Sequence, residues 1–375
     1  MTYNSRVPGT ETIAVNAAIV GERPTGLGLY ALQLIAALDA LGERLIVYTS
    51  QPDLVRARRA TVCAIPAAIR PERGARWHLS RLLWVQTGLR LRVRAAKPAL
   101  LLNLFPEGLL APRVPQVTVI HDLLPLHYPE EYPRQQHYFR YYVPAVLRFS
   151  RAVIVSSEST RRDLLNLYHL PPEKLCVIHP GYDARRFSPD GADSHAEPYA
   201  LYVGNVMPHK NLIRLVEAFA KAARGPRKLV IRGWGRRRHV RALRERIAAL
   251  GLEARVDWEP YAKAEELPRL YRGARMLLLP SLYEGFGLTA LEAMACGTPV
   301  ITSNTSSLPE VVGDAALLVD PLDTAAIAEA IARLFTDDHL AQELRERGLG
   351  RAQLFSWEKT GRAVQAAMRE ATKRT

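Results

Sequence analysis

Residues 280–300 read PSLYEGFGLTALEAMACGTPV, and this stretch decides how the second half of the chain folds. An apolar run ends at Pro280, a loop containing glycine follows, and good helix formers begin at Leu288. Gly297 and Pro299 predict the end of that helix and the start of another strand. The order strand, loop, helix, strand is typical of a parallel α/β sheet that binds ligands at the carboxyl ends of its strands.

The loop and first helical turn of this stretch carry groups suited to a phosphorylated nucleotide. The glycines free the backbone, and the N–H groups of Gly287 and Leu288 can bind a phosphate at the helix start. Glu292 lies about one turn into the helix and can accept hydrogen bonds from ribose hydroxyls. Glu284 or Glu292 taken alone could equally be a solvated surface carboxylate. Chance is a poor explanation for the whole ordered pattern.

The same alternation of apolar runs and helical spacing extends over the rest of the chain. Most of the runs lack in/out alternation, as expected for parallel strands covered on both faces. The sequence therefore predicts an α/β fold with doubly wound parallel sheets. Strands are expected at residues 12–20, 44–49, 100–104, 117–121, 153–157, 199–204, 228–233, 275–280, 299–302 and 316–320, and helices at 28–41, 211–223, 236–250 and 324–335.

The chain length of 375 residues predicts two domains of about 150–200 residues. Residues 187–198 are rich in Pro, Asp, Gly and Ser and lack periodicity, which is typical of a linker. We therefore expect an N-terminal domain at residues 1–190 and a C-terminal domain at 191–355. A last helix at 356–375 is expected to pack back toward the N-terminal domain. Two such domains leave a ligand cleft between the carboxyl ends of their strands.

Two glycines follow the first predicted strand and open a helix. Gly26 and Gly28 let the backbone approach a ligand, and the helix start offers free N–H groups to an anion. The pattern is neither a full GxGxxG nor a Walker loop. A plain tight turn explains it about equally well.

A polar pair ends the predicted strand at residues 117–121. A side chain at that place points toward the ligand edge of an α/β domain, so His121 could bind a sugar hydroxyl or handle a proton near neutral pH. The alternative is a helix cap made by Asp122 beside a structural histidine.

Lys210 lies between a predicted strand and a predicted helix. A positive charge near a helix N-terminus is unfavourable unless an anion joins it, and a diphosphate would suit that place. The alternative is an ordinary solvated lysine.

Together these motifs resemble the retaining glycosyltransferases of family 4, which have the GT-B fold of two Rossmann-like domains facing each other across a cleft. The family hallmark is two glutamates separated by seven residues, and Glu284 and Glu292 fit it. Gly26 and Gly28 resemble the first glycine loop, His121 and Asp122 the acceptor-side pair, and Lys210 the phosphate-binding lysine. Residues 181–189 and 304–312, including Glu310, also match. The residues of several motifs resemble those of a branch of bacterial mannosyltransferases and related hexosyltransferases.

The resemblance has one departure. Many family members carry an arginine after the glycine that ends the first strand of the second domain, and here Asn205 follows Gly204. Asn205 can donate a hydrogen bond but brings no charge. Arg232 is a candidate to supply the missing positive charge.

The resemblance implies a site in which Lys210, Glu284 and His121 serve the reaction. Lys210 and the N–H groups around Phe286 would hold the donor diphosphate, Glu292 the ribose, Glu284 the sugar ring, and His121 the sugar's 6-hydroxyl or the reacting region. It also implies transfer with retention, no metal and no cofactor, and the sequence contains no Asp-x-Asp pair. GDP-mannose is the first expectation for the donor and a UDP-sugar the second. The acceptor would be a glycan or lipid-linked molecule in cell-surface polysaccharide or lipopolysaccharide synthesis. The implied donor-binding residues are Gly26, Gly28, Gly204, Asn205, Arg232, Gly285, Phe286, Gly287, Leu288 and Glu292.

A formal charge of +14 leaves nucleic acid, anionic lipid and phosphorylated substrates open as partners. A coding bias toward arginine is the alternative explanation of this charge. The residues between Arg70 and Lys97 form a basic segment that could lie on an anionic membrane or be an ordinary domain helix. Its cations are Arg70, Arg73, Arg76, Arg81, Arg90, Arg92, Arg94 and Lys97, interleaved with Trp77, Leu79, Leu82, Leu83 and Trp84.

Other classes of protein fit the sequence less well. The three cysteines, Cys63, Cys176 and Cys296, are far apart and support neither disulfides nor a zinc site. No signal peptide or membrane span is evident, so we expect a cytoplasmic protein that can contact the inner face of the plasma membrane. Nucleic-acid binding lacks a reading motif, and a dehydrogenase lacks the full glycine fingerprint. A binding protein without catalysis is disfavoured by the intact set of site residues.

Overall fold

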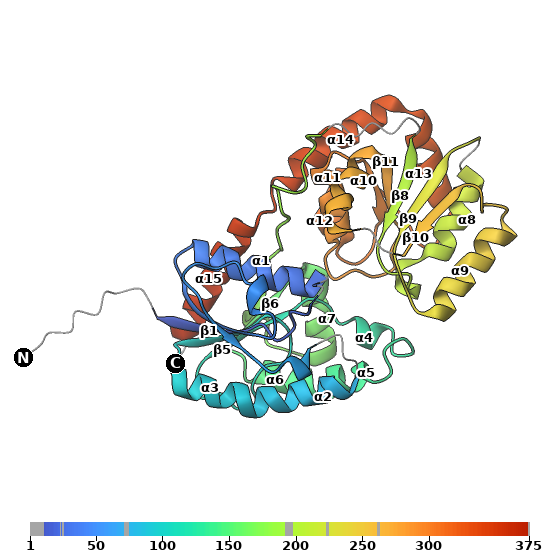
Figure 1. Ribbon diagram of the computed structural model, residues 1–375. Coiled ribbons are helices and arrows are strands. Elements are labelled where there is room, and N and C mark those ends of the chain that lie inside the picture. The colour runs from blue at the N-terminus through green and yellow to red at the C-terminus, as the bar shows by residue number, and fades with distance from the viewer. Residues whose placement is uncertain are drawn as a thin grey trace, which may run out of the picture. The chain divides into compact units, whose positions relative to one another are not determined.

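The computed structural model describes residues 11–22, 24, 26–70, 75–191, 198–222, 225–260 and 263–373. These residues form two compact units, one ending at Gly181 and completed by the chain from Trp357 onward, the other Tyr182–Ser356. Each unit contains one sheet in which every strand pairing is parallel, and helices lie between successive strands (Figure 1). The doubly wound α/β prediction is therefore confirmed.

The sheet of the first unit has the strand order β3-β2-β1-β4-β5-β6-β7. Its interior strand β1 pairs with both neighbours, and Val15 lies opposite Val47 on one side and Leu102 on the other, all fully buried. Burial on both faces explains why these strands are continuous apolar runs. The strands are β1 (Thr12–Asn16), β2 (Arg44–Thr49), β3 (Thr61–Ala64), β4 (Leu100–Asn103), β5 (Gln116–Ile120), β6 (Ala152–Val155) and β7 (Leu175–Val177).

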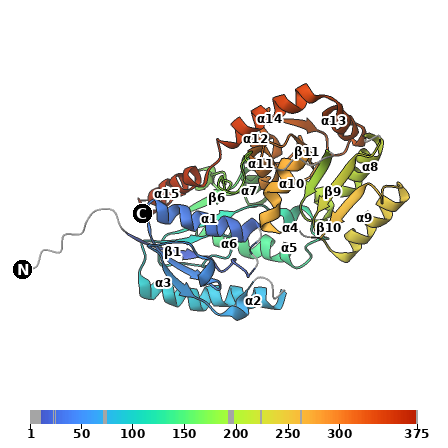
Figure 2. The same cartoon turned by 45° about the horizontal axis from the view of Figure 1, so that its top comes forward.

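Helices cover both faces of this sheet (Figure 2). On one face, Val15 packs with Leu34 of α1 and Val364 of α15. On the other, Ala14 packs with Leu89 and Val93 of the chain from α2 to α3. The helices are α1 (Gly26–Ala40), α2 (Ala75–Trp84), α3 (Arg90–Ala96), α4 (Leu124–His127), α5 (Gln135–His137), α6 (Val143–Arg148), α7 (Glu158–Tyr168) and α15 (Trp357–Lys373), with π-helical turns η4 (Val85–Leu89) and η5 (Tyr138–Tyr142) and short 3₁₀ turns η1 (Pro52–Leu54), η2 (Ala67–Ile69) and η6 (Pro172–Lys174).

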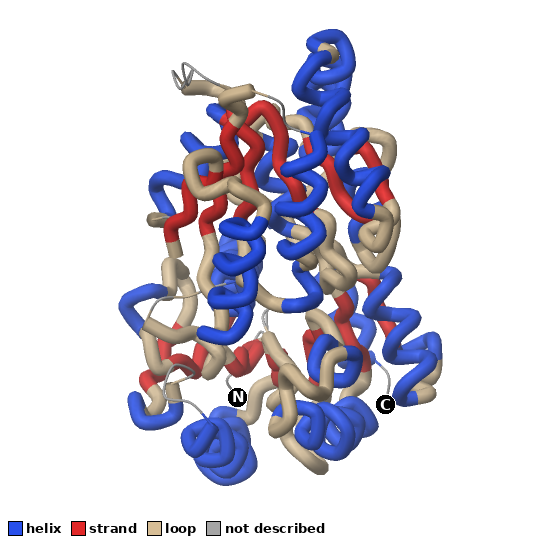
Figure 3. Tube along the Cα trace, turned by 90° about the vertical axis from the view of Figure 1, so that its right-hand side faces the viewer, coloured by secondary structure: helices blue, strands red, loops and turns tan. Residues whose placement is uncertain are grey.

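The sheet of the second unit has the order β10-β9-β8-β11-β12-β13. Figure 3 shows its strands in red with blue helices beside them. Its core includes Tyr202 of β8 and Phe219 of α8, both fully buried. The strands are β8 (Tyr199–Val203), β9 (Lys228–Arg232), β10 (Val256–Glu259), β11 (Ala274–Leu279), β12 (Val300–Ser303) and β13 (Ala316–Val319). The helices are α8 (Leu212–Ala222), α9 (Arg237–Ala249), α10 (Leu267–Gly273), α11 (Leu288–Ala295), α12 (Leu308–Val312), α13 (Thr324–Thr336) and α14 (Asp338–Ala352), with 3₁₀ turns η7 (Pro208–Lys210) and η8 (Ala264–Glu266).

The second unit begins earlier than the boundary expected at residue 190. Phe187 is only 4% exposed and its ring centroid lies 5.9 Å from that of Tyr271, inside the core of the second unit. Its side chain therefore belongs to a packed core and not to a linker. Residues 192–197 of the expected linker lie outside the described residues. Helix α15 packs on α1 of the first unit, where the rings of Trp357 and Tyr30 are 5.4 Å apart.

Three further features bear on the expectations for this chain. All three cysteines are free thiols. Within the described ranges, no cluster of three or more His, Cys, Asp or Glu side chains is arranged to hold a metal ion. The described part of the chain also contains no helix that is both long and apolar enough to span a bilayer.

Candidate active site

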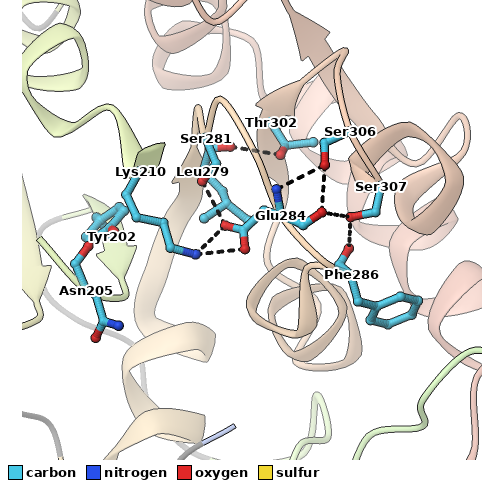
Figure 4. Close-up of polar contacts among 10 residues, drawn as sticks. All are labelled: Tyr202, Asn205, Lys210, Leu279, Ser281, Glu284, Phe286, Thr302, Ser306 and Ser307. Atoms are coloured by element: carbon cyan, nitrogen blue, oxygen red, sulfur yellow. Dashed lines mark hydrogen bonds and ion pairs between the residues drawn. The ribbon is translucent and has the colours of Figure 1, made fainter. Parts of the chain in front are cut away.

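An ion pair joins two of the residues that the sequence singled out in the second unit. Lys210 Nζ lies 2.6 Å from Oε1 and 2.7 Å from Oε2 of Glu284 (Figure 4). The side chains are 17% and 12% exposed, so the pair is partly shielded from solvent and is held by charge-assisted hydrogen bonds. The anion that joins Lys210 at this helix start is thus the carboxylate of Glu284.

The turn that carries Lys210 is fastened to the strand end before Glu284. Asn211 adopts the left-handed conformation with φ of +62° and is 5% exposed. Its amide donates to the carbonyl oxygens of Pro280 at 3.0 Å and Pro321 at 2.7 Å. The N–H of Leu282 also donates to the carbonyl of His209 at 2.7 Å. These bonds fix the two segments together, so the ion pair forms between preorganised loops.

Three serines hold the Glu284 loop. The Ser281 hydroxyl donates to Oε1 of Glu284 at 2.8 Å. Ser306 Oγ accepts from the N–H of Glu284 at 3.0 Å and donates to its carbonyl at 2.6 Å. The hydroxyl of Ser307 lies within hydrogen-bond distance of the carbonyls of Glu284 and Phe286, at 2.9 and 2.8 Å. Both the carboxylate and the backbone of Glu284 are therefore held in place (Figure 4).

Helix α11 begins directly after this loop. Gly287 is its N-cap with φ of +107°, and a Cβ there would lie 2.9 Å from the Leu308 side chain. The positive φ favours glycine, and a larger residue would also have to displace the Leu308 side chain. Among the described residues, no side chain caps this end and no acidic residue lies in the first turn, which starts at Leu288. The N–H groups and the positive end of the helix dipole are thus suited to an anion.

Glu292 lies one turn into α11 and faces α10. Its Oε2 accepts a hydrogen bond from the Tyr271 hydroxyl at 3.0 Å. Burial raises the pKa of the Glu292 carboxyl from 4.5 to about 7, and the Tyr271 hydrogen bond and the charge of Arg186 act in the opposite direction. Near neutral pH this carboxyl can therefore both donate and accept hydrogen bonds, as a hydroxyl-rich ligand requires.

His121 and Asp122 follow β5 in the first unit. His121 Nε2 lies 3.2 Å from the carbonyl of Leu104, and because a carbonyl only accepts, Nε2 carries the proton. Burial lowers the pKa of His121 to about 4, so the ring is neutral near pH 7 and Nδ1 is an acceptor. This lowered pKa argues against proton transfer by His121 near neutral pH, and its hydrogen bond to a sugar hydroxyl stays a prediction. Asp122 accepts from the N–H of Leu124 at 3.0 Å in the turn before α4, whose N-cap is Leu123 and which has no side-chain cap.

Comparison with known proteins decides the family. The family model for Glycosyltransferase Family 4 matches residues 24–186, and that for Glycosyl transferases group 1 matches residues 184–351. Over 258 residues the chain is 32% identical to O-antigen chain mannosyltransferase B of Escherichia coli, covering 64% of this chain and 67% of that protein. The chain belongs to glycosyltransferase family 4. It is accordingly a nucleotide-sugar-dependent hexosyltransferase, as the sequence predicted.

Two further similarities agree with the family 4 assignment. The chain is 34% identical over 245 residues to D-inositol 3-phosphate glycosyltransferase of Frankia alni, covering 60% of each protein. The chain thus spans about three fifths of that relative's length. Sucrose-phosphate synthase from Thermosynechococcus elongatus superposes with a TM-score of 0.80 at 25% identity, covering 97% of this chain and 100% of that one. These neighbours confirm the GT-B fold.

The other predicted donor residues of this family 4 enzyme lie in both units. Gly26 is the exposed first residue of α1, and buried Gly28 lies where a Cβ would be 2.8 Å from Pro24. Gly204 follows β8 with φ of +152°, and exposed Asn205 is tied through its carbonyl to the Tyr202 hydroxyl at 2.8 Å.

Arg232 has contacts that differ from the expected one. Its guanidinium contacts Asp257 Oδ2 at 2.8 Å and Glu259 Oε2 at 3.3 Å, both on the neighbouring strand β10. Its described contacts therefore join β9 to β10, and none leads to Lys210 or Glu284. Both carboxylates are on exposed side chains, and the contact of Arg232 with a diphosphate stays a prediction.

The substitution Glu292→Gln is expected to raise the melting temperature at pH 8 by several degrees while weakening donor binding. The raised folded-state pKa means that the native protein retains a proton that the unfolded chain releases between about pH 4.5 and 7. Native stability therefore falls across that window, and the penalty persists above it. Thermal melts from pH 5 to 8 measure the effect. Exposed Glu329 of α13 provides the control Glu329→Gln, and an equal shift in both variants would contradict the assignment.

Proposed function

We propose that this family 4 glycosyltransferase transfers a hexose, in the first instance mannose from GDP-mannose, with retention of the anomeric configuration. The acceptor is a glycan or lipid-linked molecule in the synthesis of cell-surface polysaccharide or lipopolysaccharide, on the cytoplasmic side of the membrane. The observation that carries the proposal is the Lys210–Glu284 pair next to the uncapped start of α11. The mannose assignment is supported by the name of the Escherichia coli relative.

The ion pair provides a way for the donor to reorganise the site. A diphosphate that binds the α11 N-terminus competes with Glu284 for the Lys210 ammonium. Glu284 then exchanges one cationic partner for the hydroxyls of the sugar ring, while Ser281 and Ser306 keep it in place. Lys210 and the helix end lower the energy of the charge that develops on the departing diphosphate.

The chemical step then needs no further base from the protein. The bond from the anomeric carbon to the diphosphate oxygen breaks, and the acceptor hydroxyl bonds to the same face of that carbon. An oxygen of the departing diphosphate takes the acceptor proton. Glu292 binds the ribose, and the neutral ring of His121 accepts a hydrogen bond at Nδ1 from a donor-sugar hydroxyl.

The charge stabilisation assigned to Lys210 and α11 leads us to propose that transfer is independent of metal ions and of any cofactor. Activity should therefore survive exhaustive chelation with EDTA. A loss of activity that Mg²⁺ or Mn²⁺ restores would contradict this part of the proposal.

A donor screen tests the proposed function directly. Thermal shift is measured with GDP, UDP, ADP and their hexose conjugates, followed by turnover on lipid-linked glycan acceptors. The largest stabilisation is expected with GDP and GDP-mannose, because a ligand that binds only the native state raises the melting temperature. A preference for uridine compounds would favour the UDP-sugar alternative. The proposed function fails if no nucleotide sugar stabilises the protein.

We also propose that the chain from α2 to α3 contacts an anionic membrane. Leu79, Leu83 and Leu91 are 62%, 59% and 66% exposed, and Leu79 and Leu83 lie four residues apart on one face of α2. Exposed Arg92, Arg94 and Lys97 continue the segment. An exposed leucine row with cations beside it matches an interfacial helix on anionic lipid.

Other cations of this segment serve the protein itself. Arg70 pairs with Glu22, Arg81 is buried against Glu107, and Arg90 donates to the carbonyl of Ala111. Arg73 lies outside the described residues, as do the side chains of Arg76 and Trp77. Leu82 and Trp84 are only partly exposed. The proposed membrane face is therefore narrower than the whole basic segment.

Replacing Leu83 and Leu91 together with glutamine should reduce sedimentation with phosphatidylglycerol vesicles more than tenfold. Each leucine loses about 1.5–3 kcal/mol of burial in the bilayer interface. The matched control is Leu167→Gln, because Leu167 of α7 is also exposed, at 45%. Equal binding by the double variant and the control at low salt would remove the membrane contact.

A further inference from the structure

A cavity of about 580 Å³ opens where strands of the first sheet begin. His121 lies at the opposite, carboxyl end of β5. The walls of the cavity include Pro115, Arg151 and Lys174, which directly precede β5, β6 and β7. It therefore lies at the amino ends of three adjacent parallel strands. Ligands of open α/β sheets bind at the carboxyl ends, so the donor and acceptor sites do not explain this cavity.

The lining of this cavity is strongly basic. Arg113, Arg148, Arg151 and Lys174 contribute four cations, and Glu173 contributes the one carboxylate. Arg113, Arg148 and Arg151 are exposed. Like charges gathered around one concave surface repel each other and raise its local positive potential.

The pKa of the Lys174 ammonium is lowered by its surroundings in this cavity. Burial lowers the pKa of its ammonium, the charges of Arg151 and Arg148 lower it further, and Glu173 opposes them. The end of helix α6 explains one contact, because Lys174 Nζ donates to the carbonyl of Arg148 at 3.1 Å and cations are favoured at helix C-termini. It does not explain why three arginines gather there as well.

The cavity also offers an apolar wall. Pro112, Val114, Pro115 and Phe149 line it, and Phe149 is 44% exposed. A volume of this size suits a small organic molecule better than a single ion. Apolar surface beside several cations matches a ligand that joins a phosphate to an organic body, since arginine binds phosphate through paired hydrogen bonds.

We propose that this cavity is a second anion site of the protein, which binds the phosphate of an organic phosphate. The phosphate is held by Arg148, Arg151 and Lys174, with Arg113 at the rim and Phe149 against the organic part. The ligand is a soluble phosphate ester or the headgroup of an anionic phospholipid, which share this chemistry.

The test uses the full chain with Lys210→Gln as the parent, so that pyrophosphate binds the donor site more weakly. The cavity variant adds Arg148→Gln and Lys174→Gln. The matched control adds Arg56→Gln and Arg58→Gln instead, which remove two exposed charges ahead of β3, at the other side of the same sheet. Calorimetry with inorganic pyrophosphate tests a soluble ligand. Sedimentation with vesicles of phosphatidylcholine and phosphatidic acid tests a lipid ligand.

The cavity variant is expected to bind pyrophosphate, vesicles or both more than tenfold more weakly than the control. Loss of pyrophosphate binding alone assigns a soluble ester, and loss of vesicle binding alone assigns a lipid headgroup. Equal binding by the cavity variant and the control in both arms overturns the proposal, as does a parent that binds neither probe. If the double variant does not fold, Arg113→Gln on the exposed loop replaces it under the same criteria.

Discussion

Replacing Lys210 with glutamine is expected to lower kcat/KM for hexose transfer by about 10²–10³-fold, the usual cost of removing one group that stabilises transition-state charge. Lys210 is the cation bound to both oxygens of Glu284, and the proposed mechanism transfers it to the donor diphosphate. Glutamine keeps a hydrogen-bond donor of similar reach but removes the charge. The loss should appear mainly in kcat, since the leaving group gains charge in the transition state.

The matched control for this prediction is Lys221→Gln. Lys221 lies in the last turn of α8 and is exposed, so the same substitution removes the same charge from the same unit. Its kcat/KM should stay within about twofold of the parent, because exposed charges far from a site contribute little. Steady-state kinetics with the donor from the screen measures both variants. Parent-like activity in Lys210→Gln would contradict the role given to this lysine.

Most strands of both sheets could be predicted, because a strand that is buried on both faces is a continuous run of apolar residues. An expected apolar run coincides with each of β1, β2, β4, β5, β6, β8, β9, β11, β12 and β13, although β1 ends at Asn16 instead of continuing to residue 20. The strands β3, β7 and β10 had no expected counterpart. They are three of the four edge strands and are only partly buried, and polar residues such as those in β10 obscure the apolar pattern. The fourth edge strand, β13, coincides with an expected run.

The chemistry of the site could be predicted only as far as local pattern reaches. Glu284 and Lys210 were found from the residues around them, but they are 74 positions apart, and only the fold pairs them. Asn211 and Ser306 were missed, although an asparagine after a short turn is a signal for the left-handed conformation that Asn211 adopts. Ser306 carried no such signal, because its role depends on a loop of another strand.

The basic segment also shows that a local sequence pattern does not reveal contacts between distant residues. Sequence placed Arg81 among the cations that could face a membrane, whereas its guanidinium contacts Oε1 and Oε2 of Glu107 at 2.6 Å each. The two side chains are 8% and 2% exposed. His78 Nε2 lies 3.1 Å from the same carboxylate, and the Asn16 amide donates to the Glu107 carbonyl at 2.8 Å. A charge with a distant partner cannot be distinguished from a free one by its neighbours in sequence.

Arg81→Met is therefore expected to lower the free energy of unfolding by about 3–5 kcal/mol, because it leaves the Glu107 carboxylate buried without its main partner. Arg94→Met is the control: Arg94 is exposed on α3 of the same basic segment, so its effect should stay within about 0.5 kcal/mol. Adding Glu107→Gln to Arg81→Met should recover much of the loss, since no buried charge then remains unpaired. Guanidinium unfolding of the four proteins measures these differences. Equal stability of Arg81→Met and Arg94→Met would mean that solvent reaches Glu107 and would return Arg81 to the candidate membrane face.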